Sequence, residues 1–590
     1  MIVLQQGYLK VEVTTAREAQ PVSAAKVLIM FADGSTAETV TNASGETTLF
    51  SQFAPDRSVS MDPEYDGDVY STCDVEITAF RFLTTYINGV QIYAGETNIL
   101  PVSMEPVEIG HGGTNSPIVI EIPPNHLNER THEADPPPEG GTPRVLDSVV
   151  IPENITVHLG RPTATANNVT ITFPNYIKNV CCSEIYSTWP ENAIRANIYC
   201  QISLALNRVF TEWYRSRGYS FDITNSTQYD QYYVHGRNVS ENVSRIVDEV
   251  FRTYIRKGTN IEPFFAEYCN GTTATCPGLK QWGTVSLANQ GYTPLGILRY
   301  YYGNEINLTE AGIVKGIPMS YPGTPLRQGS TGDAVRAIQT QLLRIRQNYP
   351  LIPNIGSADG VFGAQTTAAV RTFQSIFSMT TDGVVGAATW YRISFIYVAV
   401  TKLAELTSEG IQGPAITPPP SIRLQIGDTG EAVTLAQFIL NVAADFYDAI
   451  QPIPVDGVFG RLTSIATQEF QTQMNITADG IIGPVTWDAL YETYYDIMNT
   501  VDPVNLQYPG TLLRLGSISS NVSIMQRYLN YIGMFFPSIQ TLTIDANFGN
   551  ATKTAVTTFQ GLFGLNPDGI IGPLTWNQIV TTYNILANNI

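Results

Sequence analysis

One acidic residue, Glu184, stands where a carboxyl group could act as a catalytic acid. It ends a short apolar run and precedes a turn at Trp189-Pro190. The stretch that follows has apolar residues every four positions, which predicts a helix whose first turn tolerates the proline. These apolar residues are Ile194, Ile198, Ile202 and Leu206. We therefore expect Glu184 beside a helix N-terminus, where the helix dipole lowers a carboxyl pKa unless burial opposes it.

Two cysteines, Cys269 and Cys276, are the other residues whose spacing could form a site. A zinc ion with His235 as a third ligand is one interpretation, but zinc usually needs three or four thiolate or imidazole ligands. The chain has only five histidines, so a disulfide or two free thiols is the favoured interpretation. No HExxH, GxSxG or P-loop pattern occurs, which argues against zincins, serine hydrolases and nucleotide-binding enzymes.

The composition limits the kind of partner. The chain has 590 residues, of which 43% are hydrophobic and 14% charged, and this length suits about four to five globular domains. It contains 33 basic and 52 acidic residues, a net charge of −19. Basic clusters that would neutralise phosphates are missing, so nucleic acid is not expected as a partner. A neutral or mixed-charge polymer suits such a surface better.

Neither a membrane span nor a secretion signal is predicted. No window reaches about 18 uncharged apolar residues, the minimum for a transmembrane helix. The start, MIVLQQGYLKVEV, lacks the basic residues and long apolar core of a signal peptide. The six cysteines are too few for a disulfide framework in a chain of this length. Cys181, Cys182 and Cys200 are therefore expected as reduced thiols in a helical core.

The C-terminal half contains a threefold repeat. Its first turn reads ADGVFG at 358–363, VDGVFG at 455–460 and IDANFG at 544–549. In every copy Phe-Gln follows the first Asp by fourteen residues, a second Asp-Gly follows that Phe by nine, and Thr-Trp comes eight residues later. The repeat predicts three compact helical units in which Phe and Trp form the core and the Asp-Gly pairs form turns.

These units resemble the peptidoglycan-binding type 1 domain, a three-helix cell-wall module. The resemblance covers residues 324–400, 421–497 and 511–585. The Pro-rich segments 413–421 and 501–510 are expected to be stiff connectors between the copies. Three such modules would bind a repetitive polymer with avidity if their spacing lets them engage together.

The third copy departs from this family's pattern in two places. Ser520 replaces the second glycine of the opening turn, and Ala546 replaces the glycine after Asp545. Glycine adopts positive φ angles without strain, whereas alanine does not. The first turn of this copy is therefore expected to be rearranged.

The N-terminal part, residues 1–122, has a different pattern. Short alternating runs such as LKVEVTT, AKVLIMF and VEITAF are separated by turn residues, which predicts a small β-sandwich. The stretch NASGETTLF resembles transthyretin-like and carboxypeptidase regulatory-like modules. Residues 123–148 are rich in Pro, Gly and charge, which predicts an exposed linker that is open to proteolysis.

The segment between linker and repeats, 149–318, resembles the catalytic domain of stage II sporulation protein D. Three blocks carry the resemblance: NVCCSEIYSTWPENAIRANIY at 179–199, FDITNSTQYDQYYVHG at 221–236, and a block at 267–303 that contains QWGTVSLANQG and ends in YYYG. The resemblance implies an α+β domain and lytic transglycosylase activity on peptidoglycan glycan strands. Glu184 occupies the position of the family's catalytic glutamate.

In that reaction a single carboxyl group acts twice. It protonates the glycosidic oxygen between MurNAc and GlcNAc, and then takes the proton of the muramoyl 6-hydroxyl as that oxygen closes on the anomeric carbon. No water attacks, so the second carboxylate of ordinary glycosidases is not required. The acid must begin protonated. We expect burial against Tyr186 and Trp189 to raise the pKa of Glu184 more than a helix N-terminus lowers it.

The same resemblance suggests substrate contacts. Arg195 stands where the family has a lysine and keeps the positive charge, and Trp282 occupies a tyrosine position in the third block. Gln228, Tyr229 and Gln281 are candidate sugar contacts, with a core or turn role as the alternative.

Together these features resemble SleC-type spore cortex-lytic enzymes. The resemblance implies a multidomain α+β protein with a β-sandwich-like pro-region, an α+β catalytic domain and three small three-helix modules. It would cleave spore cortex peptidoglycan during germination, after a germination protease cuts the inactive precursor in the linker, near Arg144. It would be made without a signal peptide in the mother cell, with no cofactor, nucleic acid or membrane involved. The alternatives are a non-catalytic peptidoglycan-binding scaffold, a zinc amidase, which would need a fuller set of metal ligands, and a phage-type lysin, which would not explain the pro-region.

Overall fold

The computed structural model describes most of the chain. The described residues are 3–107, 116–127, 148–317, 319–408, 422–500, 512–536 and 538–562, with 567–572, 575–576, 579–580 and 582–583. The predicted cut near Arg144 and the predicted connectors 413–421 and 501–510 lie outside them. The chain divides into two compact units, Met1–Thr500 and Val501–Ile590, and each is described by itself.

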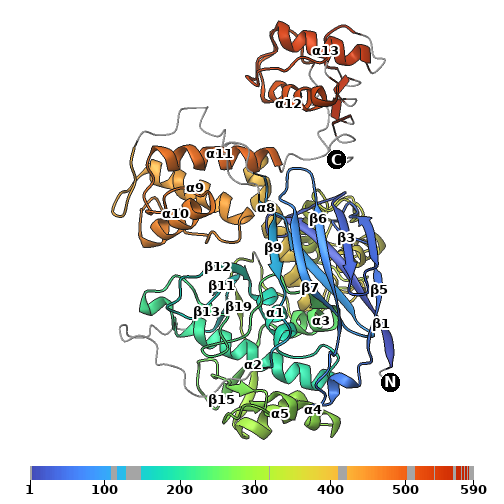
Figure 1. Cartoon of the computed structure of the whole chain (residues 1–590), viewed down its shortest axis with the longest axis vertical. Coiled ribbons are helices and arrows are strands. Elements are labelled where there is room, and N and C mark those ends of the chain that lie inside the picture. Colours follow the sequence, from blue (N-terminus) through green and yellow to red (C-terminus); the bar gives the residue numbers. More distant parts are fainter. Residues whose placement is uncertain are drawn as a thin grey trace. The chain divides into compact units, whose positions relative to one another are not determined.

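The first unit begins with two five-stranded sheets that share one core (Figure 1). One sheet has the order β14-β8-β1-β2 with β5 also paired to β1, and the other has the order β4-β3-β6-β7-β9. The strands are β1 (Leu4–Thr15), β2 (Gln20–Pro21), β3 (Lys26–Phe31), β4 (Thr36–Val40), β5 (Phe50–Pro55), β6 (Ser71–Thr78), β7 (Thr85–Ile92), β8 (Thr97–Ser103), β9 (Ile118–Glu121) and β14 (Val239–Ser240). A short 3-10 helix, η1, spans Val59–Met61.

The strands follow from the alternating pattern of the sequence. In β1 every second residue faces inward, and Leu9, Val11 and Val13 are fully buried. The strand-rich N-terminal region is therefore confirmed. The sandwich is not built from this region alone, because β14 belongs to the following region and pairs antiparallel with β8 through Val239 opposite Ile99.

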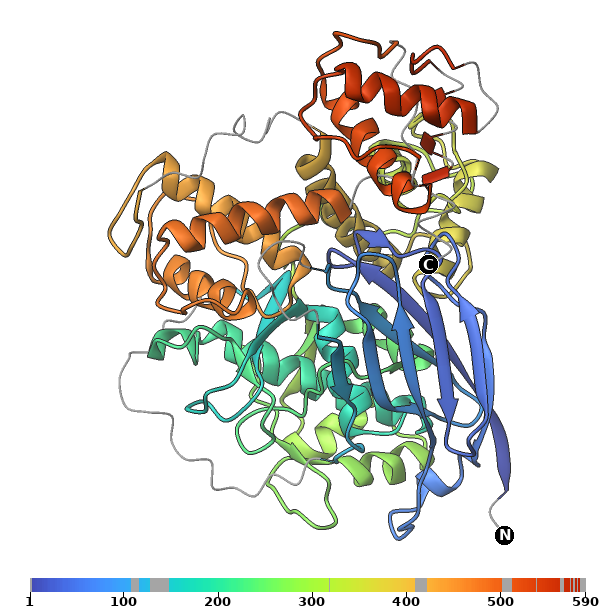
Figure 2. The same ribbon diagram turned by 45° about the horizontal axis from the view of Figure 1, so that its top comes forward.

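The central region surrounds one long helix, α2 (Glu191–Phe210), in which Ile194, Ile198, Ile202 and Leu206 are all buried as predicted. The other helices are α1 (Phe173–Glu184), η2 (Arg215–Arg217), α3 (Glu241–Val250), α4 (Gln281–Asn289) and α5 (Pro294–Tyr302). The strands are β10 (Val150–Ile151), β11 (Asn154–His158), β12 (Asn168–Thr172), β13 (Ile223–Thr224), β15 (Thr253–Lys257), β16 (Tyr268–Cys269), β17 (Leu279–Lys280), β18 (Ile306–Glu310) and β19 (Ile313–Val314). Helix α2 packs against α1, α3, α4 and α5, and Figure 2 shows this group beside the N-terminal strands.

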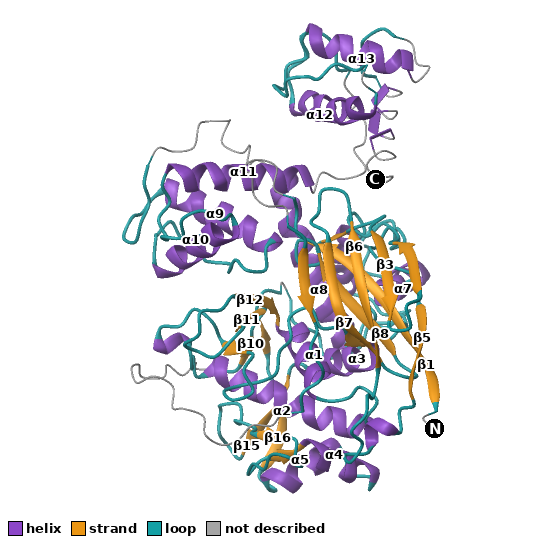
Figure 3. Cartoon of the chain, in the orientation of Figure 1, coloured by secondary structure: helices purple, strands orange, loops and turns teal. Residues whose placement is uncertain are grey.

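The repeats form helical modules, seen as purple ribbons in Figure 3. Their helices are α6 (Asp333–Ile345), α7 (Ala364–Ile376) and α8 (Ala387–Ser408) in module 1, α9 (Glu431–Phe446), α10 (Arg461–Gln473) and α11 (Pro484–Thr500) in module 2, and α12 (Ser520–Phe535) and α13 (Asn550–Leu562) in module 3. The repeated tryptophans Trp390, Trp487 and Trp576 are fully buried, as expected for core anchors. Module 3 makes up the second unit.

In the modules, a buried glutamine side chain forms hydrogen bonds to both sides of each turn that begins with the repeated Asp. We call this arrangement the glutamine bracket. In module 1 the Gln339 side-chain amide donates to Asp359 Oδ1 (2.9 Å), to the carbonyl of Val361 (3.1 Å) and to Thr366 Oγ1 (3.2 Å), while its oxygen accepts from the backbone N–H of Gly360 (2.7 Å). The same bracket occurs at five more glutamines: Gln374, Gln437, Gln471, Gln526 and Gln560. Each module therefore contains the bracket twice.

The first turn of module 3 keeps the geometry of the other modules, contrary to the expected rearrangement. Ala546 adopts φ 60°, and its N–H still donates to Gln526 Oε1 at 3.2 Å. The residue at the position of the second opening glycine is Ser519 rather than Ser520. Ser519 is the N-cap of α12 with an extended φ of −169°, whereas Gly332 has φ 116°.

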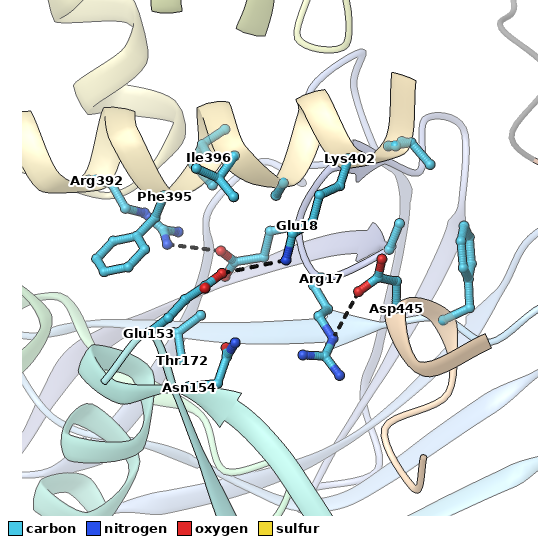
Figure 4. Close-up of a pocket in the computed structure, with 15 residues that line it drawn as sticks. Arg17, Glu18, Glu153, Asn154, Thr172, Arg392, Phe395, Ile396, Lys402 and Asp445 are labelled. Carbon is cyan, nitrogen blue, oxygen red and sulfur yellow. Dashed lines mark hydrogen bonds and ion pairs between the residues drawn. The ribbon is translucent and has the colours of Figure 1, made fainter. Parts of the chain in front are cut away.

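The turn between β1 and β2 joins three parts of the first unit (Figure 4). Glu18 pairs with Arg392 of module 1 at 2.9 Å, and the Glu18 carbonyl accepts from the Tyr349 hydroxyl at 2.6 Å. Arg17 donates to the carbonyl of Ala444 in module 2 at 2.8 Å. We call these contacts the turn junction.

The turn itself has an unusual backbone. Three of its four residues, Ala16, Arg17 and Glu18, have positive φ angles, 53°, 51° and 65°. A left-handed conformation costs a non-glycine residue about 1–2 kcal/mol, so the contacts of the turn junction must offset that cost. Nearby, Lys402 of α8 pairs with Glu153 at 3.6 Å, which also ties module 1 to the central region.

Candidate active site

Glu184 is the last residue of α1 and is fully buried. The expectation that it lies beside a helix N-terminus is wrong. Helix α2 begins at Glu191, and the α2 residue that binds the carboxylate is Gln201, whose amide donates to Glu184 Oε2 at 2.9 Å. Ten residues of helix correspond to about 15 Å, and a helix dipole acts only within about one turn of its end. The end of α1 at Glu184 is the negative one, which disfavours an ionised carboxylate there.

Two further donors reach the Glu184 carboxylate from other segments. The Tyr268 hydroxyl donates to Oε2 at 2.7 Å, and the backbone N–H of Tyr232 donates to Oε1 at 3.0 Å. The pKa of Tyr268 is raised well above its ordinary value by burial, and further by the charge of Glu184 and their hydrogen bond. Tyr268 therefore stays protonated and remains a donor at physiological pH.

A second layer of side chains orders these donors. Gln231 donates to the Tyr268 hydroxyl at 3.0 Å and to the carbonyl of Gln201 at 3.2 Å, and it accepts from the Tyr176 hydroxyl at 2.9 Å. All these groups are buried, and in a low-dielectric interior such hydrogen bonds strengthen one another. Gln201, Gln231, Tyr232, Tyr268 and Glu184 together form what we call the Glu184 network.

Three aromatic rings lie next to the end of α1. Trp189 packs on Trp282 with ring centroids 4.9 Å apart, and Tyr186 makes edge contacts with both, at 5.9 Å and 6.2 Å. The structure thus brings Trp282, a predicted site residue, against the loop that follows Glu184. Gln281 is fully buried as the first residue of α4.

The remaining candidate residues lie in other surroundings. Arg195 takes part in a surface ion-pair network with Glu191 (2.7 Å) and Glu249, which Arg245 completes. The carbonyl of Tyr229 accepts from Arg208 at 3.0 Å. Arg208 lies seven residues beyond Gln201 on α2, a separation of about 10 Å along the helix. Gln228 precedes Tyr229 in the same partly buried turn.

Sequence reasoning missed Gln201, Gln231 and Tyr268. A signal existed for two of them. Gln201 stands between the buried-face residues Ile198 and Ile202 of a predicted helix, and Gln231 follows Asp230 within the second family block. Tyr268 gave no such signal, because nothing local distinguishes it among the 31 tyrosines of the chain.

Cys269 and Cys276 are joined to each other in a disulfide, with their Cα atoms 6.0 Å apart. A zinc ion needs reduced thiolates, so this pair does not fit a zinc site. His235 lines a different place, a cavity of about 220 Å³ between the N-terminal sheets and the central region. No group of three metal-ligating side chains occurs among the described residues. Cys181, Cys182 and Cys200 are buried free thiols, as predicted.

The disulfide also bears on the Glu184 network. Cys269 follows Tyr268 in β16, which pairs in parallel with β17, and Gln281 and Trp282 come directly after β17. The disulfide therefore closes the connection between β16, which carries Tyr268, and β17, which precedes Trp282.

The segment that follows the N-terminal strands covers the end of α1. We call residues 123–126, Pro123-Pro124-Asn125-His126, the strap. The last carbonyls of a helix have no partner within it, and the strap satisfies two of them: the Asn125 side chain donates to the carbonyl of Cys182 (2.6 Å), and the His126 N–H donates to that of Ser183 (2.9 Å).

The loop after Glu184 is covered as well. Arg57 donates to the carbonyl of Thr188 at 3.0 Å, and the Trp189 indole donates to the carbonyl of Ser60 at 2.8 Å. Both Arg57 and Ser60 belong to the N-terminal region, so this region also packs against the loop that follows Glu184.

Comparisons with known proteins agree with the helical repeats. Residues 331–393, 429–490 and 519–579 match the family described as "Putative peptidoglycan binding domain". The chain thus carries three peptidoglycan-binding domains. No helix in the described part of the chain is long and apolar enough to cross a membrane.

Several cell-wall enzymes are similar to parts of the chain. A "Probable N-acetylmuramoyl-L-alanine amidase" of Bacillus licheniformis is 28% identical over 170 residues, which is 28% of this chain and 44% of that protein. The "N-acetylmuramoyl-L-alanine amidase CwlM" of Mycobacterium tuberculosis is 30% identical over 178 residues, 30% of this chain and 39% of that protein. The chain therefore spans less than half the length of these relatives.

One solved structure, "The crystal structure of SleB N-terminal domain", is 31% identical to this chain. The match covers 12% of this chain and 93% of that one, with a TM-score of 0.11.

Proposed function

We propose that the protein is a peptidoglycan lytic transglycosylase that cleaves the MurNAc–GlcNAc bond of spore cortex during germination and is made as an inactive precursor. The observation that carries the proposal is the Glu184 network, a single carboxylate held by three donors at the end of a buried helix. It lies in a chain with three peptidoglycan-binding domains. The similar amidases support a role in cell-wall degradation in general.

The arrangement suits a reaction that uses one carboxyl group twice. Protonated Glu184 gives its proton to the glycosidic oxygen as the bond from the MurNAc anomeric carbon to that oxygen breaks. The Glu184 carboxylate then takes the proton of the MurNAc 6-hydroxyl while O6 bonds to the anomeric carbon, which restores the acid. Water is not consumed, and the product ends in 1,6-anhydromuramic acid. The side chains of Gln201 and Tyr268 hold the carboxylate in one orientation during both steps.

The contacts that the strap and the N-terminal region make around the end of α1 support an inactive precursor. Glu184 is fully buried, and the strap together with Arg57 and Ser60 binds the end of α1 and the loop that follows it. A glycan strand therefore reaches Glu184 only after these residues move. A cut within residues 128–147 would separate the strap from the central region in sequence, which is the step we assign to a germination protease.

The experiment uses the full chain with the recognition sequence of a site-specific protease placed within residues 128–147. The cut and uncut proteins are incubated with purified spore cortex, and the released fragments are identified by mass spectrometry. The cut protein should release fragments ending in 1,6-anhydromuramic acid, and Glu184→Gln should lower that release by about a hundred- to ten-thousandfold, the scale for loss of a catalytic acid–base group. Glu191→Gln, a surface carboxylate seven residues away, is the matched control.

Two results would overturn the proposal. Binding to cortex without released fragments would mean a non-catalytic scaffold. Free stem peptides with intact glycan strands would mean amide cleavage, the reaction named for the similar proteins.

A further inference from the structure

Arg237 is a buried cation whose partners come from the strap. It is 1% exposed, and its Nη2 donates to the carbonyl of Pro123 at 2.6 Å while Nη1 lies 3.4 Å from Asn125 Oδ1. Its Nε–H is buried without a partner among the described residues. Burial lowers the pKa of Arg237. A buried guanidinium normally pairs with a carboxylate, whereas the hydrogen-bond partners of Arg237 among the described residues are the neutral oxygens of Pro123, Pro124 and Asn125.

The strap links Arg237 to the end of α1, the helix that carries Glu184. Asn125 accepts from Arg237 with its side-chain oxygen and donates to the carbonyls of Cys182 (2.6 Å) and Ile185 (3.3 Å) with its amide. These two residues flank the Ser183-Glu184 end of α1. One asparagine side chain therefore separates the guanidinium from the backbone that carries Glu184.

The segment around Arg237 is covered by the N-terminal region on both sides. A Cβ atom on Gly236 would lie 2.6 Å from Ile120 of β9, and Asn238 exchanges two hydrogen bonds with the backbone of Gln91. When the N-terminal region leaves, Arg237 is uncovered beside Glu184.

We propose that Arg237 is a substrate-binding residue that takes a carboxylate of the peptide stem on MurNAc, and that the strap carbonyls occupy its place in the precursor. This inference rests on the function proposed above. A guanidinium binds a carboxylate with two parallel hydrogen bonds, which the single short bond to Pro123 and the unpartnered Nε–H do not provide. The stem carboxylate therefore gives Arg237 stronger hydrogen bonds than the strap does. Its binding places the peptide-bearing sugar next to Glu184.

The first measurement compares substrates with and without stems. The cut full chain and its Arg237→Met variant are given glycan strands with peptide stems and the same strands after the stems are removed. Loss of a charged hydrogen-bonded pair costs about tenfold or more. We expect KM for stem-bearing strands to rise by about that factor in the variant with kcat nearly unchanged, and activity on stem-free strands to stay within about twofold.

Arg245→Met is the matched control, because Arg245 pairs with Glu191 and Glu249 on the surface and should leave both substrates unaffected. Arg237→Lys keeps the charge without the planar fork and should give an intermediate KM. Methionine fills a buried site without an unpaired charge, so the Arg237→Met chain should fold. Equal KM values for parent and variant on stem-bearing strands would overturn the proposal.

The second measurement does not depend on catalysis. Two labelled ligands are used, a GlcNAc–MurNAc disaccharide with a tripeptide stem and the same disaccharide without it. Fluorescence anisotropy measures the binding of each ligand to the cut parent chain and to the cut variant chain. The peptidoglycan-binding domains contribute equally to both proteins. The Arg237 assignment is supported if the parent's preference for the stem-bearing sugar exceeds that of the variant by about tenfold. This holds even if no anhydromuramic ends are released, and the two results together would reject only the proposed reaction. Equal preferences would reject the Arg237 assignment even in an active transglycosylase.

Discussion

Two opposing effects act on the Glu184 carboxyl group. Complete burial at the negative end of α1 favours its neutral form, whereas three converging donors stabilise its ionised form. A lytic transglycosylase needs both forms in turn, first as acid and then as base. The Glu184 network therefore matches the proposed chemistry more closely than a site that stabilises only one form.

Removing the Tyr268 hydroxyl, one of these donors, tests this balance. Tyr268→Phe removes the hydroxyl that donates to Glu184 and accepts from Gln231, and keeps the buried ring. Hydrogen bonds to charged groups are worth about 1.5–3 kcal/mol, so kcat should fall by about ten- to a hundredfold with little change in KM. Tyr254→Phe, a buried tyrosine on β15, is the control and should retain activity. An unchanged kcat in Tyr268→Phe would remove Tyr268 from the network.

At the scale of elements, the repeats show which departures a fold tolerates. The bracketing glutamine of module 3 holds the turn at Ala546 in its left-handed form although glycine is missing. The pKa of Asp545 in this turn is lowered by its hydrogen bonds to Gln526 and to the Asn547 N–H. These bonds explain why the predicted rearrangement does not occur.

Ala546→Gly should stabilise module 3, because it removes the strain of φ 60° at a non-glycine residue. The expected gain is about 1 kcal/mol, read as a higher melting temperature of the second unit in calorimetry of the full chain. Ala551→Gly makes the same change on the exposed face of α13 and should destabilise the unit by up to about 1 kcal/mol. A loss of stability in Ala546→Gly would show that the turn is not strained.

At the scale of the whole molecule, the turn junction distinguishes module 1 from the other modules. Arg392 stands two residues after the repeated tryptophan, where module 2 has Ala489 and module 3 has Gln578. Its pair with Glu18 therefore cannot form in the other modules. The repeat that binds the N-terminal turn is thus specified by a residue outside the repeat pattern.

Arg392→Ala should loosen this junction. The residue is largely buried and paired with Glu18, and breaking such a pair leaves a partly buried carboxylate, at a cost of about 1–4 kcal/mol. We expect a lower melting temperature of the first unit and faster amide hydrogen exchange in the turn at residues 16–19. Arg371→Ala, an exposed arginine of α7, should change neither. Equal exchange in the turn for both variants would mean that the Glu18 pair does not hold it.

Much of the architecture was predictable because its signals are local. The alternation in β1, the four-residue periodicity of α2 and the repeated Phe and Trp spacings each reflect residues within one strand, one helix or one small module. Neighbours along the chain decide which face of such an element is buried. The strand-rich N-terminal region and the helical repeats followed from these patterns, and so did the buried free cysteines of the central region.

The surroundings of Glu184 were not predictable in this way. Its donors come from residues 17, 48 and 84 positions away, and the strap that caps α1 lies about 57 positions before Cys182. The resemblance to a family pointed to Glu184, but its place at the end of α1, its contact with Tyr268 and its cover by the strap depend on how distant segments pack. Polar groups in a core are specified by the partners that packing brings to them, and only the tertiary structure supplies those partners.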